Sequence, residues 1–151
     1  MMKEVFKVII IIGLLHLVLV SGNQIFNIFN YSLREIEMMA RMVCAESENE
    51  PFAGKVAVAA VILNREKHHQ FPNDIESVIF QSSQFSPLLD GRYWTVEPRF
   101  IHTWAVIRAI WGYDPSYGSL FFQNPSTRTN YWQDENTYVV TVIGNHEFRH
   151  P

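Results

Sequence analysis

The run Val56-Ala57-Val58-Ala59-Ala60-Val61-Ile62-Leu63 constrains the fold more than any other segment, because it is apolar on every face that a helix could turn outward. Such a helix is stable only where other elements surround it. We therefore expect a central, buried helix over residues 52–66, whose alanines let its neighbours approach closely. The polar residues Asn64-Arg65-Glu66-Lys67 predict that this helix returns to solvent at its end.

The size and composition of the chain limit its class. Its 151 residues suit one domain, and with 48% apolar and 18% charged residues it has the material for a hydrophobic core. The net charge of −3 is spread over mixed signs, which offers no long basic patch for nucleic acid. The single cysteine, Cys44, excludes an intramolecular disulfide framework and a multi-cysteine zinc site.

The N-terminus has the composition of an export signal. Two lysines precede the apolar stretch 8–20, and Val20-Ser21-Gly22 suits cleavage by a signal peptidase. This stretch is shorter than the roughly 20 residues that span a bilayer. We expect residues 1–22 to be a cleaved signal peptide or an uncleaved anchor that attaches the protein to the membrane, residues 23–31 a linker or docked arm, and residues 32–151 the domain. Both alternatives place the domain outside the cytoplasm.

The remaining pattern predicts an α+β domain that is mainly helical. Ser32 and Glu35 form a capping box ahead of an amphipathic helix that ends near residues 44–46. Residues 75–80 favour a short helix, residues 81–87 a loop, and Glu97-Pro98 the start of another helix. Strands are expected over 120–122 and 138–143, with Gly144-Asn145 as a hairpin turn. The apolar faces of the two longer amphipathic helices are expected to be Leu33, Ile36, Met39, Ala40 and Val43, and Phe100, Trp104, Ile107 and Ile110 or Trp111.

The sharpest chemical feature is the segment Glu46-Ser47-Glu48-Asn49-Glu50-Pro51, between the amphipathic helix and the apolar one. Desolvation at such a junction can keep Glu46 protonated near neutral pH, which is what a general acid for a glycosidic oxygen requires. Three carboxylates in five residues also suit an ordinary solvated junction. Composition alone leaves both interpretations open.

Blocks spread over most of the chain carry a family resemblance: Ala40–Glu46, Glu50-Pro51, Gly54–Arg65, Phe71-Pro72, Val78-Ile79, Gln84–Ser86 with Asp90-Gly91, Asn124-Pro125, and Ile143–His146 with Phe148. In these blocks the sequence resembles the spore cortex-lytic and cell wall hydrolase family of bacteria. The resemblance implies a lysozyme-like catalytic domain with Glu46 as the catalytic residue. It also implies cleavage of the β-1,4 bond between amino sugars, with peptidoglycan glycan strands as the partner, in the cell wall or spore envelope.

The sequence departs from the family pattern at three places. Cys44 stands where an aromatic residue is common, Ser47-Glu48-Asn49 replaces a typical Ala-Arg-Gly, and Phe121-Phe122-Gln123 lies where tyrosines are frequent. These departures bear on substrate preference and leave the expected reaction class unchanged.

Glu46 would protonate the leaving oxygen and then act as a base, either on water or on the muramoyl 6-hydroxyl group. Retaining and inverting glycosidases normally use a second carboxylate about 5 to 9 Å away. Glu50 or Asp90 could serve, but Glu50 equally suits the first turn of the following helix. We therefore favour a lytic transglycosylase over a glucosaminidase or muramidase-type hydrolase. The alternative from another class is a non-catalytic glycan-binding or germination-accessory protein.

Further residues are candidates for substrate binding. Beside Glu50 they are Gln84, Ser86, Asn124 and Trp132, with Tyr93, Trp94 and Tyr131 as further aromatic residues that could stack on sugar rings. Ser86 suits a helix cap or turn equally well, and Asn124 before Pro125 suits a turn. We expect no metal and no cofactor, because the four-residue spacing of His146 and His150 falls beside a strand, where the two side chains do not share a ligand.

Overall fold

The computed structural model describes residues 30–127 and 131–151. The expected export signal, residues 1–22, and nearly all of the expected linker lie outside these residues. Tyr31, at the end of that linker, is docked on the domain, because its hydroxyl group donates a hydrogen bond to Glu66 Oε2 at 3.1 Å. Within the described ranges, no helix combines the length and apolar character needed to cross a membrane.

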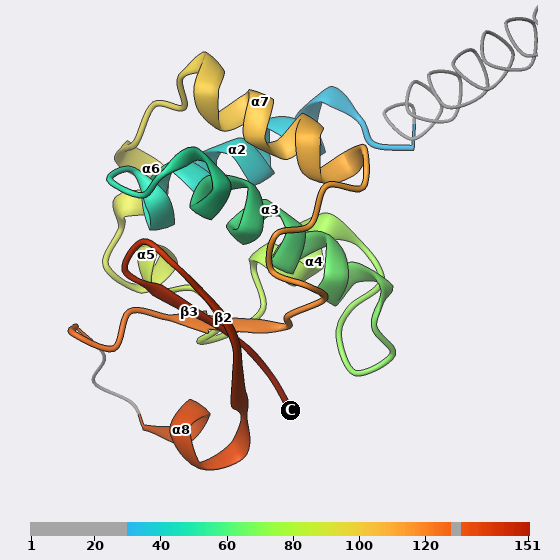
Figure 1. The fold of residues 1–151 in the computed structure, drawn as a ribbon. Helices are drawn as coiled ribbons and strands as arrows, with labels where there is room; N and C mark the ends of the chain where they lie inside the picture. The colour runs from blue at the N-terminus through green and yellow to red at the C-terminus, as the bar shows by residue number, and fades with distance from the viewer. Residues whose placement is uncertain (1–29, 128–130) are drawn as a thin grey trace, which may run out of the picture.

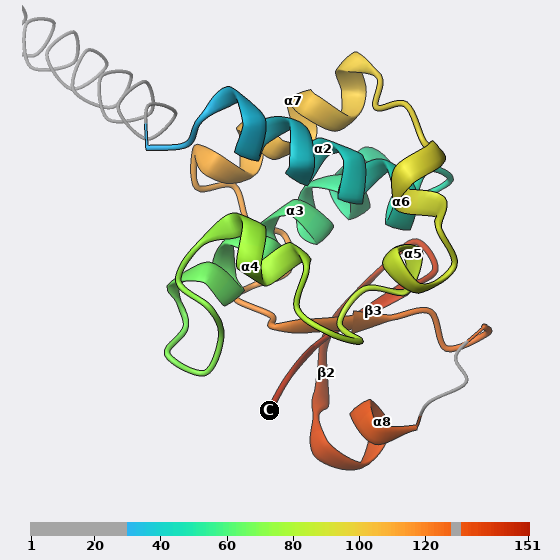
Figure 2. The same cartoon turned by 180° about the vertical axis from the view of Figure 1, so that it is seen from behind.

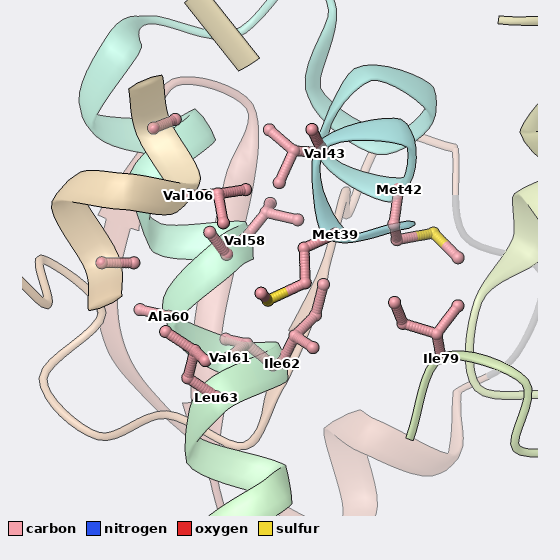
Figure 3. Close-up of a cluster of buried hydrophobic side chains, with 14 of the residues drawn as sticks. Met39, Met42, Val43, Val58, Ala60, Val61, Ile62, Leu63, Ile79 and Val106 are labelled. Carbon is pink, nitrogen blue, oxygen red and sulfur yellow. The ribbon is translucent and has the colours of Figure 1, made fainter. Parts of the chain in front are cut away.

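The helix α3 (Phe52–Lys67) is the centre of the domain. It packs against α2 (Leu33–Ser47), α4 (Ile75–Ile79), α7 (Phe100–Ile110) and the strand β1 (Phe121–Gln123). The prediction of a helix surrounded on all sides is confirmed, since all residues from Val56 to Leu63 are buried. Figure 3 shows side chains of α2 and α7 meeting those of α3, among them Met39, Val43, Val58, Ile62 and Val106.

The start of α2 follows from its sequence. Ser32 Oγ accepts a hydrogen bond from the Glu35 backbone N–H, and the Glu35 carboxylate accepts one from the Ser32 backbone N–H at 2.8 Å. This reciprocal pair is the expected capping box, and it satisfies backbone donors that the first turn leaves unpaired.

A three-stranded antiparallel sheet covers one side of the helices (Figure 1). Its order is β1-β3-β2, with β2 spanning Tyr138–Ile143 and β3 spanning His146–His150. Gly144 and Asn145 form the two-residue turn between β2 and β3, as predicted, and Ile143 pairs with His146 across it. The short helices α5 (Ser86–Leu89) and α6 (Arg92–Thr95) flank the helical side (Figure 2), and α8 (Trp132–Asn136) precedes β2. The α+β, mainly helical class is thus confirmed.

Three expectations about burial are wrong. Leu33 is 86% exposed and Phe100 is 81% exposed, although both were placed on apolar faces. The buried face of α7 instead carries mostly small side chains, among them Ala105, Val106 and Ala109, because α2 and α3 approach α7 closely there. Arg65 does not return to solvent, because β1 and the loop before α5 cover the end of α3.

Ser86 was expected in a loop but is the first residue of α5, where Pro87 sits in the first turn. Proline suits this position because its missing N–H would have no helical partner there. The predicted loop is therefore confined to residues 81–85.

Candidate active site

A cleft of about 550 Å³ lies where the end of α2 faces the sheet and the loop before α5. Polar side chains dominate its wall, and they come from segments far apart in the sequence. Five of the six residues singled out from the sequence line it: Glu46, Glu50, Gln84, Ser86 and Asn124. Further lining residues include Glu48, Arg65, Arg92, Phe122, Gln123, Gln133, Asn145 and His146.

Glu46 lies in the last turn of α2, on the side facing the cleft. Burial raises the pKa of its carboxyl group to about 7, and the nearby Asp90 acts in the same direction, while Arg92 and Arg65 oppose the rise. Loss of hydration penalises the charged form of a carboxyl group, which explains the direction. At neutral pH a substantial fraction of Glu46 is therefore protonated and able to donate a proton.

The backbone around Glu46 is fixed from two directions. The buried Lys55 of α3 donates hydrogen bonds to the carbonyl oxygens of Ser47, of Glu48 at 2.7 Å and of Glu50 at 2.8 Å. On the other side, Arg92 Nη1 donates to the Ala45 carbonyl oxygen at 2.9 Å. The carbonyls of Ala45, Ser47 and Glu48 belong to the end of α2, where intrahelical partners are missing and a cation is favourable, and that of Glu50 lies in the turn before α3.

Glu50 ties the segment after α2 to the β2–β3 turn. Its two carboxylate oxygens accept hydrogen bonds from the backbone N–H and the side-chain amide of Asn145, at 2.9 and 3.0 Å. Gly144 allows this approach, because its φ is +60° and an added Cβ would lie 2.8 Å from Pro51 Cδ. The carboxylate thus lines the cleft and at the same time holds one of its walls in place.

The other expected substrate-binding residues have different surroundings. Ser86 Oγ accepts a hydrogen bond from Arg92 Nη2 at 3.3 Å, and Asn124 Oδ1 accepts one from the Ser126 backbone N–H at 2.9 Å, the turn contact that was its alternative. Trp132 lies on α8 outside the lining of the cleft, half exposed, with its ring 5.6 Å from that of Phe121. Of the further aromatic candidates, Tyr93 is buried and cannot meet a sugar, whereas Trp94 and Tyr131 are exposed and lie outside the lining.

A second polar cluster lies beside the cleft. The potential metal-ligand atoms of Cys44, Glu48 and His102 lie within 4.8 Å of one another. Among the described residues, this is the group whose spacing would allow a metal ion to bind. The backbone N–H of Arg99 donates to His102 Nδ1 at 2.9 Å, so the ring proton is on Nε2, 2.8 Å from Glu48 Oε2. A metal-bound Nε2 needs the reverse tautomer. The cluster is therefore arranged for hydrogen bonding, with Arg99 paired to Glu48.

Several lining residues escaped the sequence-based prediction. Arg65 was assigned to solvent, and His146, although part of the motifs that carry the resemblance, was considered only as a metal ligand. Gln123 and Gln133 drew no attention, because an isolated glutamine carries no local pattern. The position of Gln123 depends on the antiparallel pairing of β1 with β3, which brings it opposite Glu147, and Gln133 comes from α8.

Comparison with known proteins defines the class. The cell wall hydrolase family matches residues 49–149, about two thirds of the chain, and the protein belongs to this family. The matched region begins three residues after Glu46 and so does not include this glutamate.

The curated relatives of the chain are spore cortex-lytic enzymes. Those of Oceanobacillus iheyensis and Bacillus subtilis are 44% and 40% identical over 102 residues, which is 68% of this chain. The chain spans only 37% and 33% of the length of these relatives. Among solved structures, the catalytic domain of the Bacillus cereus SleB protein superposes with a TM-score of 0.72 at 40% identity, covering 80% of this chain and 92% of that domain. The catalytic domain of the Bacillus anthracis germination-specific lytic transglycosylase SleB gives 0.73 at 40% identity, covering 80% and 97%.

Proposed function

We propose that this domain degrades peptidoglycan by cleaving the β-1,4 bond between amino sugars of the glycan strand, with Glu46 as general acid and base. The observation that carries the proposal is the position of Glu46 in the last turn of α2, at the wall of a polar cleft, where burial raises the pKa of its carboxyl group to about 7. The volume of the cleft, about 550 Å³, suits a segment of glycan chain, since ligand sites commonly have volumes of about 300–1,000 Å³. Membership of the cell wall hydrolase family supports the substrate class.

The reaction requires two proton transfers at Glu46. In the first, the carboxylic acid gives its proton to the glycosidic oxygen while the bond between this oxygen and C1 of the muramoyl residue breaks. In the second, the Glu46 carboxylate takes the proton of the muramoyl 6-hydroxyl group, whose oxygen attacks C1 and closes a 1,6-anhydro ring. Glu46 ends the cycle protonated, and no water is consumed.

The surroundings of the other carboxylates favour this lytic route over hydrolysis. Glu48 is paired with Arg99 and His102, and Glu50 with Asn145, so both carboxylates at the cleft wall have partners. Asp90 is paired with Arg92 at 2.8 Å. A two-carboxylate mechanism needs a second group free to activate water or to attack the sugar.

We further propose that the protein acts outside the cytoplasm, in the cell wall or spore envelope. Its relatives are spore cortex-lytic enzymes, and residues 1–22 have the composition of an export signal or membrane anchor. A peptidoglycan substrate is found only beyond the cytoplasmic membrane, so location and substrate agree.

Mass spectrometry of the soluble muropeptides released by the purified protein tests the proposal on vegetative and on cortex peptidoglycan. We expect 1,6-anhydromuramoyl ends, lost in Glu46→Gln and kept in Glu37→Gln, an exposed glutamate of α2 that lies outside the cleft. Reducing ends would show a hydrolase instead. Release that persists in Glu46→Gln would contradict the role of Glu46, and no release from either wall would favour the glycan-binding alternative.

A further inference from the structure

Arg65 is a buried charge to which the acid–base scheme assigns no role. It lies near the end of α3, is only 2% exposed, and donates from Nε to the Leu120 carbonyl oxygen at 2.7 Å. Its Cζ lies 5.2, 4.9 and 5.4 Å from the ring centroids of Phe71, Phe85 and Phe121. A side chain held on this many sides has a fixed position in the wall of the cleft.

The guanidinium group of Arg65 remains charged in this position. Burial lowers its pKa to about 10, which still leaves it protonated at neutral pH. Removing a cation from water is costly unless partners compensate, and the three aromatic rings offset part of this cost. However, the buried Nη1 has no hydrogen-bond partner within the described part of the chain. Since buried polar groups are nearly always paired, this atom calls for a functional explanation.

The group on which this charge can act is Glu46. Both residues line the cleft, and each charge shifts the pKa of the other toward its ionised form. Nη1 is sealed from solvent, so a substrate in the cleft does not reach it. The other charges that act on Glu46 are Arg92 and Asp90, which are paired with each other at 2.8 Å. Two cations of the described residues act on Glu46, Arg92 and Arg65. Arg92 is paired with a carboxylate, whereas Arg65 has no direct carboxylate partner among the described residues.

Building on the proposed role of Glu46, we propose that Arg65 is a positioning residue. Its sealed guanidinium group keeps a fixed positive charge near the Glu46 carboxyl group and stabilises the carboxylate that remains after the proton has passed to the glycosidic oxygen. No bond forms or breaks at Arg65. The same charge favours ionised Glu46 before the reaction, so Arg65 also sets the upper pH limit of activity.

An NMR titration tests the electrostatic coupling between Arg65 and Glu46 without a measurement of catalytic activity. The ¹⁵N resonances of the Arg65 guanidinium group are followed by NMR as the pH is raised, in the wild type and in Glu46→Gln. We expect a shift with its midpoint near pH 7 in the wild type and none in Glu46→Gln. Arg65 resonances that do not move in the wild type would overturn the proposal. This result is independent of whether Glu46 is catalytic, which the activity of Glu46→Gln decides separately.

Activity measurements on Arg65 variants complete the test. On soluble glycan chains, we expect Arg65→Gln to move the alkaline limit of activity upward by about one pH unit, and to lower kcat about tenfold with KM unchanged. Arg65→Lys, which keeps the charge, should recover part of both effects. The control is Arg108→Gln, since Arg108 also stacks on an aromatic ring, that of Tyr113, but lies outside the cleft lining. A folded Arg65→Gln with the wild-type pH limit would show a purely structural role and overturn the proposal.

Discussion

Two glutamates at the end of α2, Glu46 and Glu48, lie two residues apart and have pKa values shifted in opposite directions. Burial raises the pKa of Glu46 to about 7. For Glu48, partial burial also acts upward, but Arg99 and the hydrogen bonds from Cys44 and His102 outweigh it and hold the pKa below its usual value. The comparison shows that the local surroundings decide which carboxyl group can serve as a proton donor.

The same comparison explains why the two sides of this helix end are built differently. On the Glu48 side, charged groups and hydrogen-bond partners are matched, which stabilises an ion. On the Glu46 side, the charges that act on the carboxyl group are Arg92 and Asp90, which are paired with each other, and the buried Arg65, and together they do not offset the effect of burial. A carboxylate with matched partners, such as Glu48, stabilises the fold. A carboxyl group whose pKa is raised by burial, such as Glu46, is suited to proton transfer.

The largest expected effect is on activity. Glu46→Gln should lower the rate of peptidoglycan cleavage by about 10³-fold, because an amide can neither donate nor accept the transferred proton. Glu48→Gln should lose less than about tenfold, since its carboxylate is held by partners and transfers no proton. The release of soluble muropeptides over time measures both. Similar losses in the two variants would break the distinction between them.

The second effect is on stability and has a defined pH dependence. Between pH 4.5 and about 7, folded Glu46 keeps a proton that the unfolded chain has lost, so stability falls as the pH rises through this window. Glu46→Gln removes this penalty. The variant should therefore exceed the wild type by up to about 3 kcal/mol near pH 8 and by little near pH 4. Urea denaturation at both pH values measures the difference, and an equal difference at both would contradict the raised pKa.

The third effect concerns Lys55, whose hydrogen bonds fix the backbone beside Glu46 and Glu48. Lys55→Met should lower the free energy of unfolding by about 2 kcal/mol, because the carbonyl oxygens of Ser47, Glu48 and Glu50, at the end of α2 and in the turn after it, lose a charged donor. Activity should fall as well, since the Glu46 backbone loses one of its anchors. Thermal unfolding and muropeptide release are the measurements. Unchanged stability would mean that water replaces the ammonium group at no cost.

The smallest effect is expected for the stability of Glu48→Gln. Because its ion pair with Arg99 is largely exposed, the loss should be no more than about 1 kcal/mol near neutral pH. The folded pKa of Glu48 is lowered, so its contribution is present above the unfolded pKa of 4.5 and disappears as the pH falls through the folded pKa. Thermal unfolding at neutral and acidic pH checks this. A larger loss at acidic pH would contradict the assigned direction.

The sequence predicts features that depend on local pattern. The capping box at Ser32, the buried run in α3 and the turn at Gly144-Asn145 were all identified, because each follows from neighbouring residues. The buried face of α7 was identified only at Ile110, since aromatic residues such as Phe100 favoured the wrong side of the helix. Its true face depends on how closely α2 and α3 approach, which the pattern of α7 does not contain.

For the site, the sequence predicted its centre better than its walls. Glu46 and four expected neighbours do line one cleft, because the end of α2, the turn after it, the start of α5 with the loop before it, and the end of β1 meet there. Arg65 and His146 were missed as cleft residues, since polar residues at a helix end and after a turn normally face solvent. Both residues are buried because they contact β1, and a local sequence pattern does not predict these long-range contacts.

The most direct measurement is a ¹³C NMR titration of the side-chain carboxyl groups of Glu46 and Glu48 in the wild-type protein, with signals assigned by Glu46→Gln and Glu48→Gln. We expect a pKa of about 7 for Glu46 and a pKa below 4.5 for Glu48. Two carboxyl groups that both titrate near 4.5 would contradict it, because Glu46 would then carry no proton to donate at neutral pH.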